Sequence, residues 1–392
     1  MNSTFECVNL DAFHTRYVFI HGWASILVCV FGSIANSLNI AVLTRKEMIS
    51  PTNSILTGLA VADLLVMLEY IPYAVHSYLY LQPSRDRFTY GWALFVLFHA
   101  LFGQVFHTIS IWLTVTLAVW RYIAVAHPQK NREWCSFRRS VVAIVSAYVF
   151  CPVICVPLYV TTSITESTRI IDNDGMFSNT SLFNATDLPE GVTNGTVFRV
   201  VLSKNAIALN FWMYSVVIKL IPCVALTVLS LRLILALVEA KKRRKKLSQA
   251  AVVKDEVSSE CCSGKKRKKK PTRQMDKERQ TDRTTKMLLA ILLLFLLTEF
   301  PQGVLGLLSV ILGTTFFDNC YVKLGELMDV LALINSAINF ILYCAMSRQF
   351  RMTFKQLFCK SNLFGRWLPV PLHGENNGHT GTNQTVTQVT QV

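Results

Sequence analysis

The hydrophobic positions of this 392-residue chain gather into long blocks that are separated by polar segments. A helix needs roughly 20 apolar residues to cross a hydrocarbon core of about 30 Å, and each block is at least that long. The blocks lie at about 19–44, 53–80, 92–124, 139–162, 206–238, 284–312 and 321–346. This pattern predicts an all-α fold, in which residues 19–346 form a bundle of seven transmembrane helices.

A shorter segment, residues 347–359, follows the seventh block and is amphipathic. On a helix its apolar side chains share one face: Phe350, Phe354, Leu357 and Phe358. Its basic side chains, which can reach lipid headgroups, are Arg348, Arg351 and Lys355. We expect a helix that lies on the membrane surface, followed by a cytoplasmic tail over residues 360–392.

The composition excludes an ordinary soluble enzyme. Hydrophobic residues make up 52% of the chain and charged residues only 16%, against about 25% charged residues in soluble domains. The chain also lacks a phosphate-binding glycine loop, an HExxH motif and a nucleophile elbow. We therefore expect neither an enzyme nor a bound cofactor.

The net charge of +15 is concentrated in one segment, residues 239–286, which carries 18 Lys and Arg against 7 Asp and Glu. A basic run beside a membrane span is typical of a cytoplasmic loop next to anionic lipid. The segment has no periodicity that would build a nucleic-acid-binding fold, so we expect no nucleic-acid partner. Residues 239–283 are predicted to be a long cytoplasmic loop.

The loop charges also orient the bundle. The segments 45–52, 125–138, 239–283 and the C-terminal tail are basic, and basic loops stay in the cytoplasm. The other segments are near neutral or acidic, and among them residues 163–205 form a long loop. Residues 1–18 are polar and do not resemble a cleavable signal peptide. We expect a multi-pass plasma-membrane protein with residues 1–18 outside the cell.

Glycosylation sequons agree with this orientation. The asparagines of the sequons on predicted outer segments are Asn2, Asn179, Asn184 and Asn194. Three of the four fall within one loop, which is more than a chance sequon explains. We expect these asparagines to be glycosylated.

Of the eleven cysteines, only Cys7 and Cys320 fall on the predicted oxidising side of the membrane. They are either two free thiols or, as we expect, a disulfide that joins the N-terminal segment to the outer end of the seventh span. Cys359 ends the amphipathic segment and is either a palmitoylation site or an unmodified thiol.

An ordered set of short motifs resembles the rhodopsin-like G-protein-coupled receptors, over about residues 19–359. The motifs are Gly32-Ser-Ile-Ala-Asn36, Leu59-Ala-Val-Ala-Asp63, Trp120-Arg121-Tyr122, Pro222, Pro301 and Asn339-Phe-Ile-Leu-Tyr343. Each motif is weak alone, but their order and spacing match the family together. The resemblance implies a receptor that activates a heterotrimeric G protein.

The chain departs from the family pattern at several positions. Trp120 stands where the family has an acidic residue, Phe340 replaces a proline, and Glu299 replaces a tryptophan. The family's outer disulfide is absent, since Val96 stands where one cysteine would be and residues 163–205 contain no cysteine.

Further segments resemble one subgroup, the arthropod myosuppressin receptors. They lie at 50–53, 68–73, 107–114, 118–122, 298–303 and 346–350. Those receptors bind short amidated neuropeptides that end in FLRF-amide, which the resemblance implies as the ligand class here. The alternatives are another RF-amide-like peptide or, from a different class, a polytopic transporter.

The resemblance also implies roles for interior residues. One set resembles the family's sodium pocket and consists of Asp63, Ser110, Asn335, Ser336 and Asn339. Its oxygen atoms suit a hard cation, but a plain hydrogen-bond network of the same residues is the alternative. Arg121 is expected to contact the G protein, with Tyr343 as its switch partner. Arrestin is a further expected partner, and a PDZ protein could bind the C-terminal Val392.

An outer segment of about 18 residues is too short for a ligand-binding domain, so the peptide is expected to enter the bundle. Its arginine needs a carboxylate, either Glu69 or Asp329, although each acid could instead pair with a neighbour such as His76 in the empty receptor. The other residues expected to contact the peptide are Tyr73, Gln104, Phe106, His107, Tyr214, Phe300 and Gln302.

Lys219 and Glu299 are charged residues inside the fifth and sixth spans. The resemblance brings their positions together, and an ion pair between them would relieve the cost of burying either charge alone. We expect this ion pair, with His107 as a third member. The alternative is a neutral Glu299 that bonds to His107 or to a backbone carbonyl.

Overall fold

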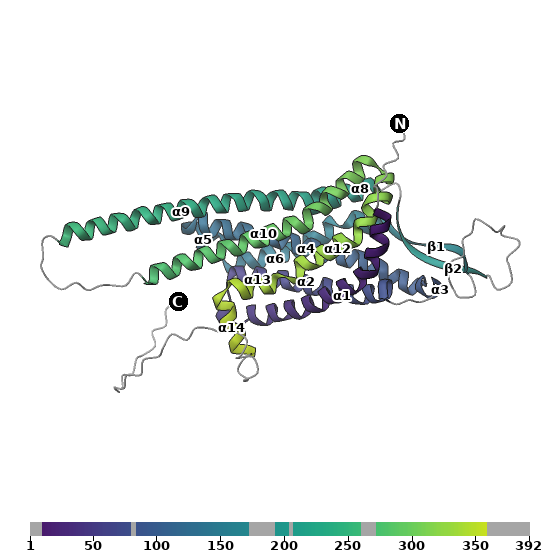
Figure 1. Ribbon diagram of the computed structural model, residues 1–392, viewed down its shortest axis with the longest axis horizontal. Coiled ribbons are helices and arrows are strands. Elements are labelled where there is room, and N and C mark those ends of the chain that lie inside the picture. Colours follow the sequence, from purple (N-terminus) through teal and green to yellow (C-terminus); the bar gives the residue numbers. More distant parts are fainter. Residues whose placement is uncertain (1–9, 80–83, 172–192, 204–206, 260–271, 359–392) are drawn as a thin grey trace.

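The structure is a computed structural model of the chain, and it describes residues 10–79, 84–171, 193–203, 207–259 and 272–358. Within these residues, seven helices are long and apolar enough to cross a membrane. The seven lie side by side as a bundle (Figure 1). The predicted seven-helix bundle is confirmed, and the protein is a multi-pass membrane protein.

Several of the seven spans consist of more than one helical segment. The first four spans are α1 (Leu10–Leu43), α2 (Pro51–Ala74) with the π-helical Val75–Leu79, α4 (Tyr90–Ala126), and α6 (Phe137–Ile154) with α7 (Val156–Thr161). The fifth combines α8 (Ile207–Trp212), the π-helical Met213–Leu220 and α9 (Ile221–Ser259). The sixth is α10 (Thr272–Leu312), and the seventh combines the π-helical Phe317–Tyr321, α12 (Val322–Ala337) and α13 (Asn339–Met346).

Shorter elements connect the spans. They are a 3₁₀ turn at Lys46–Met48, α3 (Ser84–Arg87), α5 (Pro128–Trp134), α11 (Thr314–Phe316) and α14 (Arg348–Phe358). Local chemistry sets several helix ends. The Ser50 hydroxyl accepts a hydrogen bond from the Asn53 N–H at 3.1 Å, and Pro51 occupies the first helical position of α2. After α10 ends, Gly313 adopts a left-handed backbone with φ of 80°, which glycine adopts without strain.

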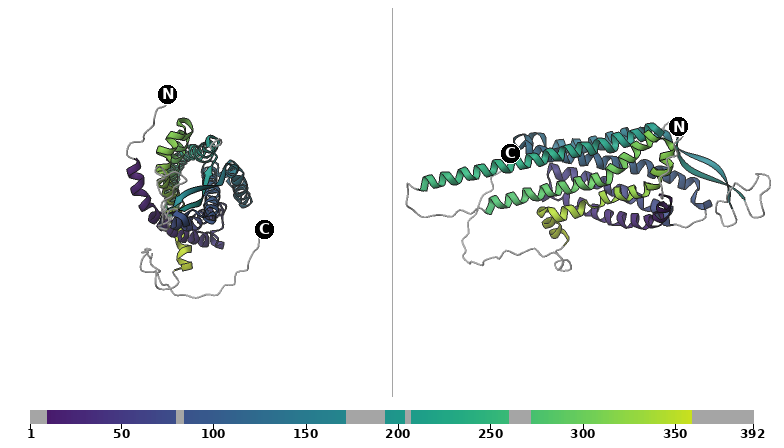
Figure 2. Two further views of the ribbon diagram at one scale, coloured as in Figure 1. Left: turned by 90° about the vertical axis from the view of Figure 1, so that its right-hand side faces the viewer. Right: turned by 45° about the horizontal axis from the view of Figure 1, so that its top comes forward.

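The two ends of the bundle differ. One end carries a two-stranded antiparallel hairpin of β1 (Thr162–Ile171) and β2 (Thr193–Leu202), and we call it the hairpin end. The opposite end carries α14 and the projecting tips of α9 and α10, and we call it the α14 end (Figures 1 and 2). The beginning of α1 lies at the hairpin end (Figure 1).

The hairpin and the long helical extensions both differ from the sequence prediction. Residues 163–205 were expected to form a loop, yet β1 and β2 pair over ten residues each, from Thr162↔Leu202 to Ile171↔Thr193. Both strands are rich in threonine, isoleucine and valine, which favour strands. Residues 239–283 were also expected to form a loop, but α9 continues to Ser259 and α10 begins at Thr272. Lysine, arginine, glutamate, glutamine and alanine favour helix, so the helices continue beyond their apolar parts.

The amphipathic helix expected after the seventh span is α14, which begins and ends within one residue of the predicted range. Phe350 is buried and lies 5.9 Å from the ring of Phe340, measured between ring centroids. Arg351 differs from the expectation, because its Nη1 donates to the carbonyls of Cys344 at 2.8 Å and Ala345 at 3.0 Å. It therefore caps the end of α13 in place of reaching toward lipid.

Close helix contact in the bundle depends on a glycine of α10. A Cβ added at Gly306 would lie 2.1 Å from the Ser215 Oγ, much closer than two such atoms can approach. The absence of a side chain thus lets α10 touch the Met213–Leu220 segment. We expect Gly306→Leu to separate these segments and lower stability by about 1–3 kcal/mol, measured as a fall in melting temperature. Gly91→Leu is the matched control, since nothing lies within 4 Å of a Cβ at Gly91, and equal melting temperatures in both variants would contradict the prediction.

Candidate ligand pocket and interior polar network

Glu299 of α10 is the centre of a buried charged cluster. Its Oε2 lies 2.5 Å from the Lys219 Nζ, and these two side chains are 0% and 1% exposed. The His107 Nε2 of α4 lies 3.2 Å from the same oxygen and 2.8 Å from the Lys219 Nζ. The Lys219 Nζ is thus within hydrogen-bond distance of both Glu299 and His107. The structure thus brings together the three residues that the sequence analysis grouped.

The other oxygen of Glu299 connects this cluster to the seventh span. The Asn335 Nδ2 of α12 lies 3.4 Å from the Glu299 Oε1. One carboxylate is therefore contacted from α4, from the Met213–Leu220 segment and from α12. Lys219 lies in that π-helical segment, and such segments are rare and occur frequently at functional sites. The Lys219 ammonium also lies 5.4 Å from the centre of the Tyr214 ring.

Asp63 is the centre of a second buried network, closer to the α14 end. The Ser110 hydroxyl donates to its Oδ1 at 2.7 Å, and the Asn339 Nδ2 donates to its Oδ2 at 3.1 Å. Ser336 lies beside the same carboxylate. Asn335, which was grouped with them, turns to Glu299. The carboxylate and hydroxyl oxygens around Asp63 fit a hard cation such as Na⁺.

Arg121 lies near the α14 end of α4, and Tyr343 of α13 lies near it. The Arg121 Nε is buried, and no described residue hydrogen bonds to it. Trp120, the residue before Arg121, carries no charge that could pair with the arginine. In the described part of the chain no carboxylate pairs with it. Tyr343 is buried against Phe350 of α14, with ring centres 5.7 Å apart.

Glu69 of α2 lies toward the hairpin end and uses only one of its two oxygens. The Oε1 pairs with the Nδ1 of His99 on α4, whose ring stacks on Tyr73 at 3.7 Å. The Oε2 is buried and has no hydrogen-bond partner among the described residues. A Cβ added at Gly103 would lie 3.5 Å from this Oε2, so the missing side chain of Gly103 leaves space beside the free oxygen.

His99 was not among the residues that the sequence analysis singled out. It lies one helical turn before Gly103 on α4, and that spacing was the available signal. His76, which was named as one alternative partner for the two acids in the empty protein, stacks on Trp92 with ring centres 3.4 Å apart.

Three further predicted pocket residues offer polar groups inside the bundle. Asp329 of α12 is half-buried and forms no hydrogen bond or ion pair with a described residue. Gln302 of α10 is buried, and its Oε1 has no partner in the described part of the chain. Gln104 donates to the Thr108 hydroxyl at 3.2 Å, within its own helix.

Two of the predicted ring-binding residues are corrected by the structure. Phe300 is 46% exposed and shares one stripe of α10 with Leu293 and Leu297, which are also exposed. In a membrane span this stripe faces lipid. Glu299, the residue directly before Phe300, points about 100° away from it around the helix and is buried. Phe106 lies against Phe102 and against Tyr148 of α6, with ring centres 4.4 and 6.2 Å away. Phe106 is therefore part of the apolar packing around α2, α4 and α6.

The beginning of α1 is tied to the seventh span. The Lys323 Nζ lies 2.7 Å from the Asp11 Oδ1, and the His14 Nδ1 lies 3.4 Å from the Glu326 Oε2. Cys320 is disulfide-bonded, and its predicted partner Cys7 lies outside the described residues. α1 was expected to begin at about residue 19, and these contacts accompany its earlier start at Leu10.

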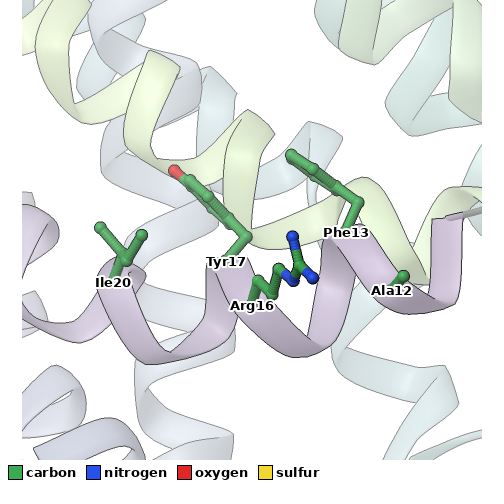
Figure 3. A pocket seen from close by; sticks show the side chains of 5 residues that line it. All are labelled: Ala12, Phe13, Arg16, Tyr17 and Ile20. Carbon is green, nitrogen blue, oxygen red and sulfur yellow. The ribbon is translucent and has the colours of Figure 1, made fainter.

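A shallow groove follows the same part of α1. Figure 3 shows that its lining comes from one helix, with Phe13 and Tyr17 side by side and Arg16 between them. The two rings stack at 5.4 Å with an angle of 10° between their planes. The groove is open and lies on the outside of the bundle, separate from the buried polar residues described above.

Four of the predicted modification sites, Asn2, Asn179, Asn184 and Cys359, lie outside the described residues. So does Val392, the predicted position for a PDZ protein. Asn194 is described and belongs to β2, where it pairs with Ile170 of β1.

Comparisons with known proteins agree with this architecture. Residues 23–261 and 262–361 match the family described as serpentine type 7TM GPCR chemoreceptor Srw. The chain is 31% identical over 370 residues to the G-protein coupled receptor dmsr-1 of Caenorhabditis elegans, which covers 89% of this chain and 70% of that protein. It is 29% identical over 344 residues to the sex peptide receptor of Drosophila melanogaster, covering 86% and 72% of the two chains.

A more distant relative is the FMRFamide receptor of Drosophila melanogaster, at 22% identity over 370 residues, covering 90% of this chain and 56% of that protein. The family match spans most of the chain and includes all seven membrane helices. The chain therefore belongs to the serpentine seven-transmembrane G-protein-coupled receptors, and it is a signalling receptor, not an enzyme.

Proposed function

We propose that this receptor binds a short C-terminally amidated neuropeptide of the myosuppressin or FLRF-amide type and then activates a heterotrimeric G protein. The motif set supports a rhodopsin-like receptor, and the printed names of two relatives are sex peptide receptor and FMRFamide receptor. Basic loops at the α14 end and the sequon of Asn194 at the hairpin end support a plasma-membrane receptor whose hairpin end faces outward.

The free oxygen of Glu69 is the single observation that carries the peptide proposal. A buried carboxylate oxygen without a donor costs free energy, and a ligand that supplies a donor removes that cost. Gly103 leaves room for a methyl-sized group beside this oxygen, since an added Cβ would lie 3.5 Å from it. A peptide arginine suits this position, because guanidinium donates in parallel to carboxylate oxygens and keeps its charge when buried.

The remaining pocket groups suit the rest of an amidated end. The Gln302 Oε1 can accept a hydrogen bond from a terminal amide, which donates and carries no charge. Tyr73 and Tyr214 offer rings to the peptide's aromatic side chains. Asp329, which has no partner in the described part of the chain, is the second acid available to the arginine.

The interior networks provide a route from this pocket toward the G protein. Lys219, His107 and Glu299 form its floor, and Asn335 connects Glu299 to the span that carries Asn339 of the Asp63 network. We assign Na⁺ binding to the Asp63 network and the G-protein contact to Arg121 and Tyr343. Arrestin and a PDZ protein at Val392 are further proposed partners, acting on the same cytoplasmic side.

Nucleotide exchange on a purified G protein tests the proposed function directly. An FLRF-amide peptide is expected to accelerate exchange in the presence of the receptor, while its free-acid form is expected to be much weaker. Other RF-amide peptides in the same assay decide between the two ligand classes. If no amidated peptide promotes exchange, the peptide proposal is wrong.

The proposed Cys7–Cys320 disulfide is tested separately. Cys320 is disulfide-bonded, and Cys7 is the other cysteine on the proposed outer side. Mass mapping of the non-reduced receptor is expected to yield one peptide that contains both cysteines. Recovery of Cys7 as a free thiol would exclude the pairing.

A further inference from the structure

The β hairpin is attached to the start of α4 through its main chain. The Phe198 N–H of β2 donates to the Phe88 carbonyl at 2.9 Å. Phe88 lies two residues before Tyr90, the first residue of α4. At the base of the hairpin, the Ser203 N–H donates to the Thr161 carbonyl at 2.8 Å, where the fourth span ends. The hairpin is thus held at its base and again along β2.

Side chains on both faces of β2 also contact the residues at the start of α4. Neighbouring residues of a strand point to opposite faces, so Phe198 and Arg199 reach out on different sides of β2. The Arg199 Cζ lies 4.6 Å from the centre of the Phe88 ring, a cation–π contact. The Phe198 ring lies 5.4 Å from the Tyr90 ring in an edge-to-face arrangement. Both faces of β2 therefore contact the segment 88–90.

No disulfide can hold the hairpin to α4 in this chain. Residues 163–205 contain no cysteine, and Val96 of α4 stands at the position of the other cysteine of the family's outer disulfide. The segment 84–89 is itself tied to the second span, because the Arg87 Nη2 donates to the Ser77 carbonyl. The hairpin, the start of α4 and the end of the second span are thereby joined without a disulfide.

We propose that Phe88, Tyr90, Phe198 and Arg199 form a noncovalent hairpin anchor that positions the hairpin at the entrance of the ligand pocket. These four are positioning residues, since they act on the hairpin and do not contact the ligand. The part of the proposal that concerns the peptide rests on the proposed function. An anchored hairpin slows escape of a bound peptide, and a released hairpin lets it leave faster.

Hydrogen exchange of the β1 and β2 amides tests the anchor without any peptide. Phe88→Leu keeps an apolar side chain and the carbonyl but removes the ring, and Arg199→Gln removes the cation. Each is expected to accelerate exchange by about five- to tenfold, while Phe88→Trp and Arg199→Lys, which keep a ring or a cation, leave it near the wild-type rate. The double variant is expected to fall short of the sum of the single variants, because both remove the contact between Arg199 and Phe88. An unchanged exchange rate in Phe88→Leu, or fully additive rate increases in the double variant, would show that these residues do not form the proposed anchor.

The peptide measurement separates this proposal from the proposed function. If the peptide binds, its dissociation is expected to be severalfold faster from Phe88→Leu than from the wild type, and near the wild-type rate in Phe88→Trp. An unchanged dissociation rate would mean that the anchor does not control the pocket. If no peptide binds, the proposed function fails, and the hydrogen-exchange experiment still decides whether the anchor exists.

Discussion

A Lys219→Met receptor is expected to lose about 3–5 kcal/mol of folding stability, because the change leaves Glu299 as a buried charge without its cation. Both side chains are almost completely inaccessible, and the Nζ and Oε2 atoms lie 2.5 Å apart. His107 and Asn335 would remain as partners, but neither supplies a fixed positive charge. The melting temperature of the purified receptor and its fraction at the cell surface are the measurements.

Two matched variants make this result interpretable. Exchanging the charges, with Lys219→Glu and Glu299→Lys in one chain, is expected to recover part of the lost stability. Lys46→Met makes the same substitution at an exposed lysine and is expected to have no effect. Equal loss in Lys219→Met and in the charge-exchanged receptor would show that the attraction between the two charges does not stabilise the bundle.

Peptide potency is expected to fall about 30-fold or more when the acid that binds the arginine is neutralised, which corresponds to 2 kcal/mol or more of binding. Glu69→Gln and Asp329→Asn are the two variants. The free Oε2 of Glu69 predicts the larger loss for Glu69→Gln. Asp11→Asn is the control, because Asp11 is an exposed acid at the beginning of α1. Potency is measured as the peptide concentration that gives half-maximal nucleotide exchange.

A modified peptide assigns the contact to one acid. With citrulline in place of arginine, the ligand keeps its shape but loses its charge. Its affinity for the wild type should match the affinity of the arginine peptide for the variant that lacks the arginine-binding acid, either Glu69→Gln or Asp329→Asn. When that variant is tested with the citrulline peptide, the affinity should fall little further than with either change alone. Gly103→Ala supplies an independent check, since a methyl group 3.5 Å from the Glu69 Oε2 fits the empty protein but crowds the arginine. Wild-type potency in both acid variants would show that this pocket assignment is wrong.

The sequence could predict the features that follow from the length and polarity of single segments. Seven apolar blocks were sufficient for seven spans, and the amphipathic pattern after them was sufficient for α14. The buried Lys219 and Glu299 could be paired in advance because each charge is too costly to bury alone, so a nearby opposite charge is its most favourable partner.

Features that depend on the rotation of one helix relative to another were harder to predict from the sequence. Phe300 and Glu299 are adjacent in sequence, yet a turn of about 100° per residue puts the ring toward lipid and the acid in the core. Likewise, the partner of Glu69 is His99 and not His76, which only the relative positions of α2 and α4 decide. The β hairpin was missed because its apolar runs are short, and a loop was the simpler reading of a polar, sequon-rich segment.

The great length of α10 has a mechanical consequence. Pro301 removes one backbone hydrogen bond from the helix interior, and prolines are the usual sites of helix bending. The helix continues for 29 residues from Pro301 back to Thr272, which at 1.5 Å per residue makes a lever arm of about 44 Å. A change of only 10° in the bend at Pro301 would swing the far tip by about 8 Å. A small adjustment beside the ligand pocket is thus magnified geometrically into a displacement large enough to open a binding face for another protein.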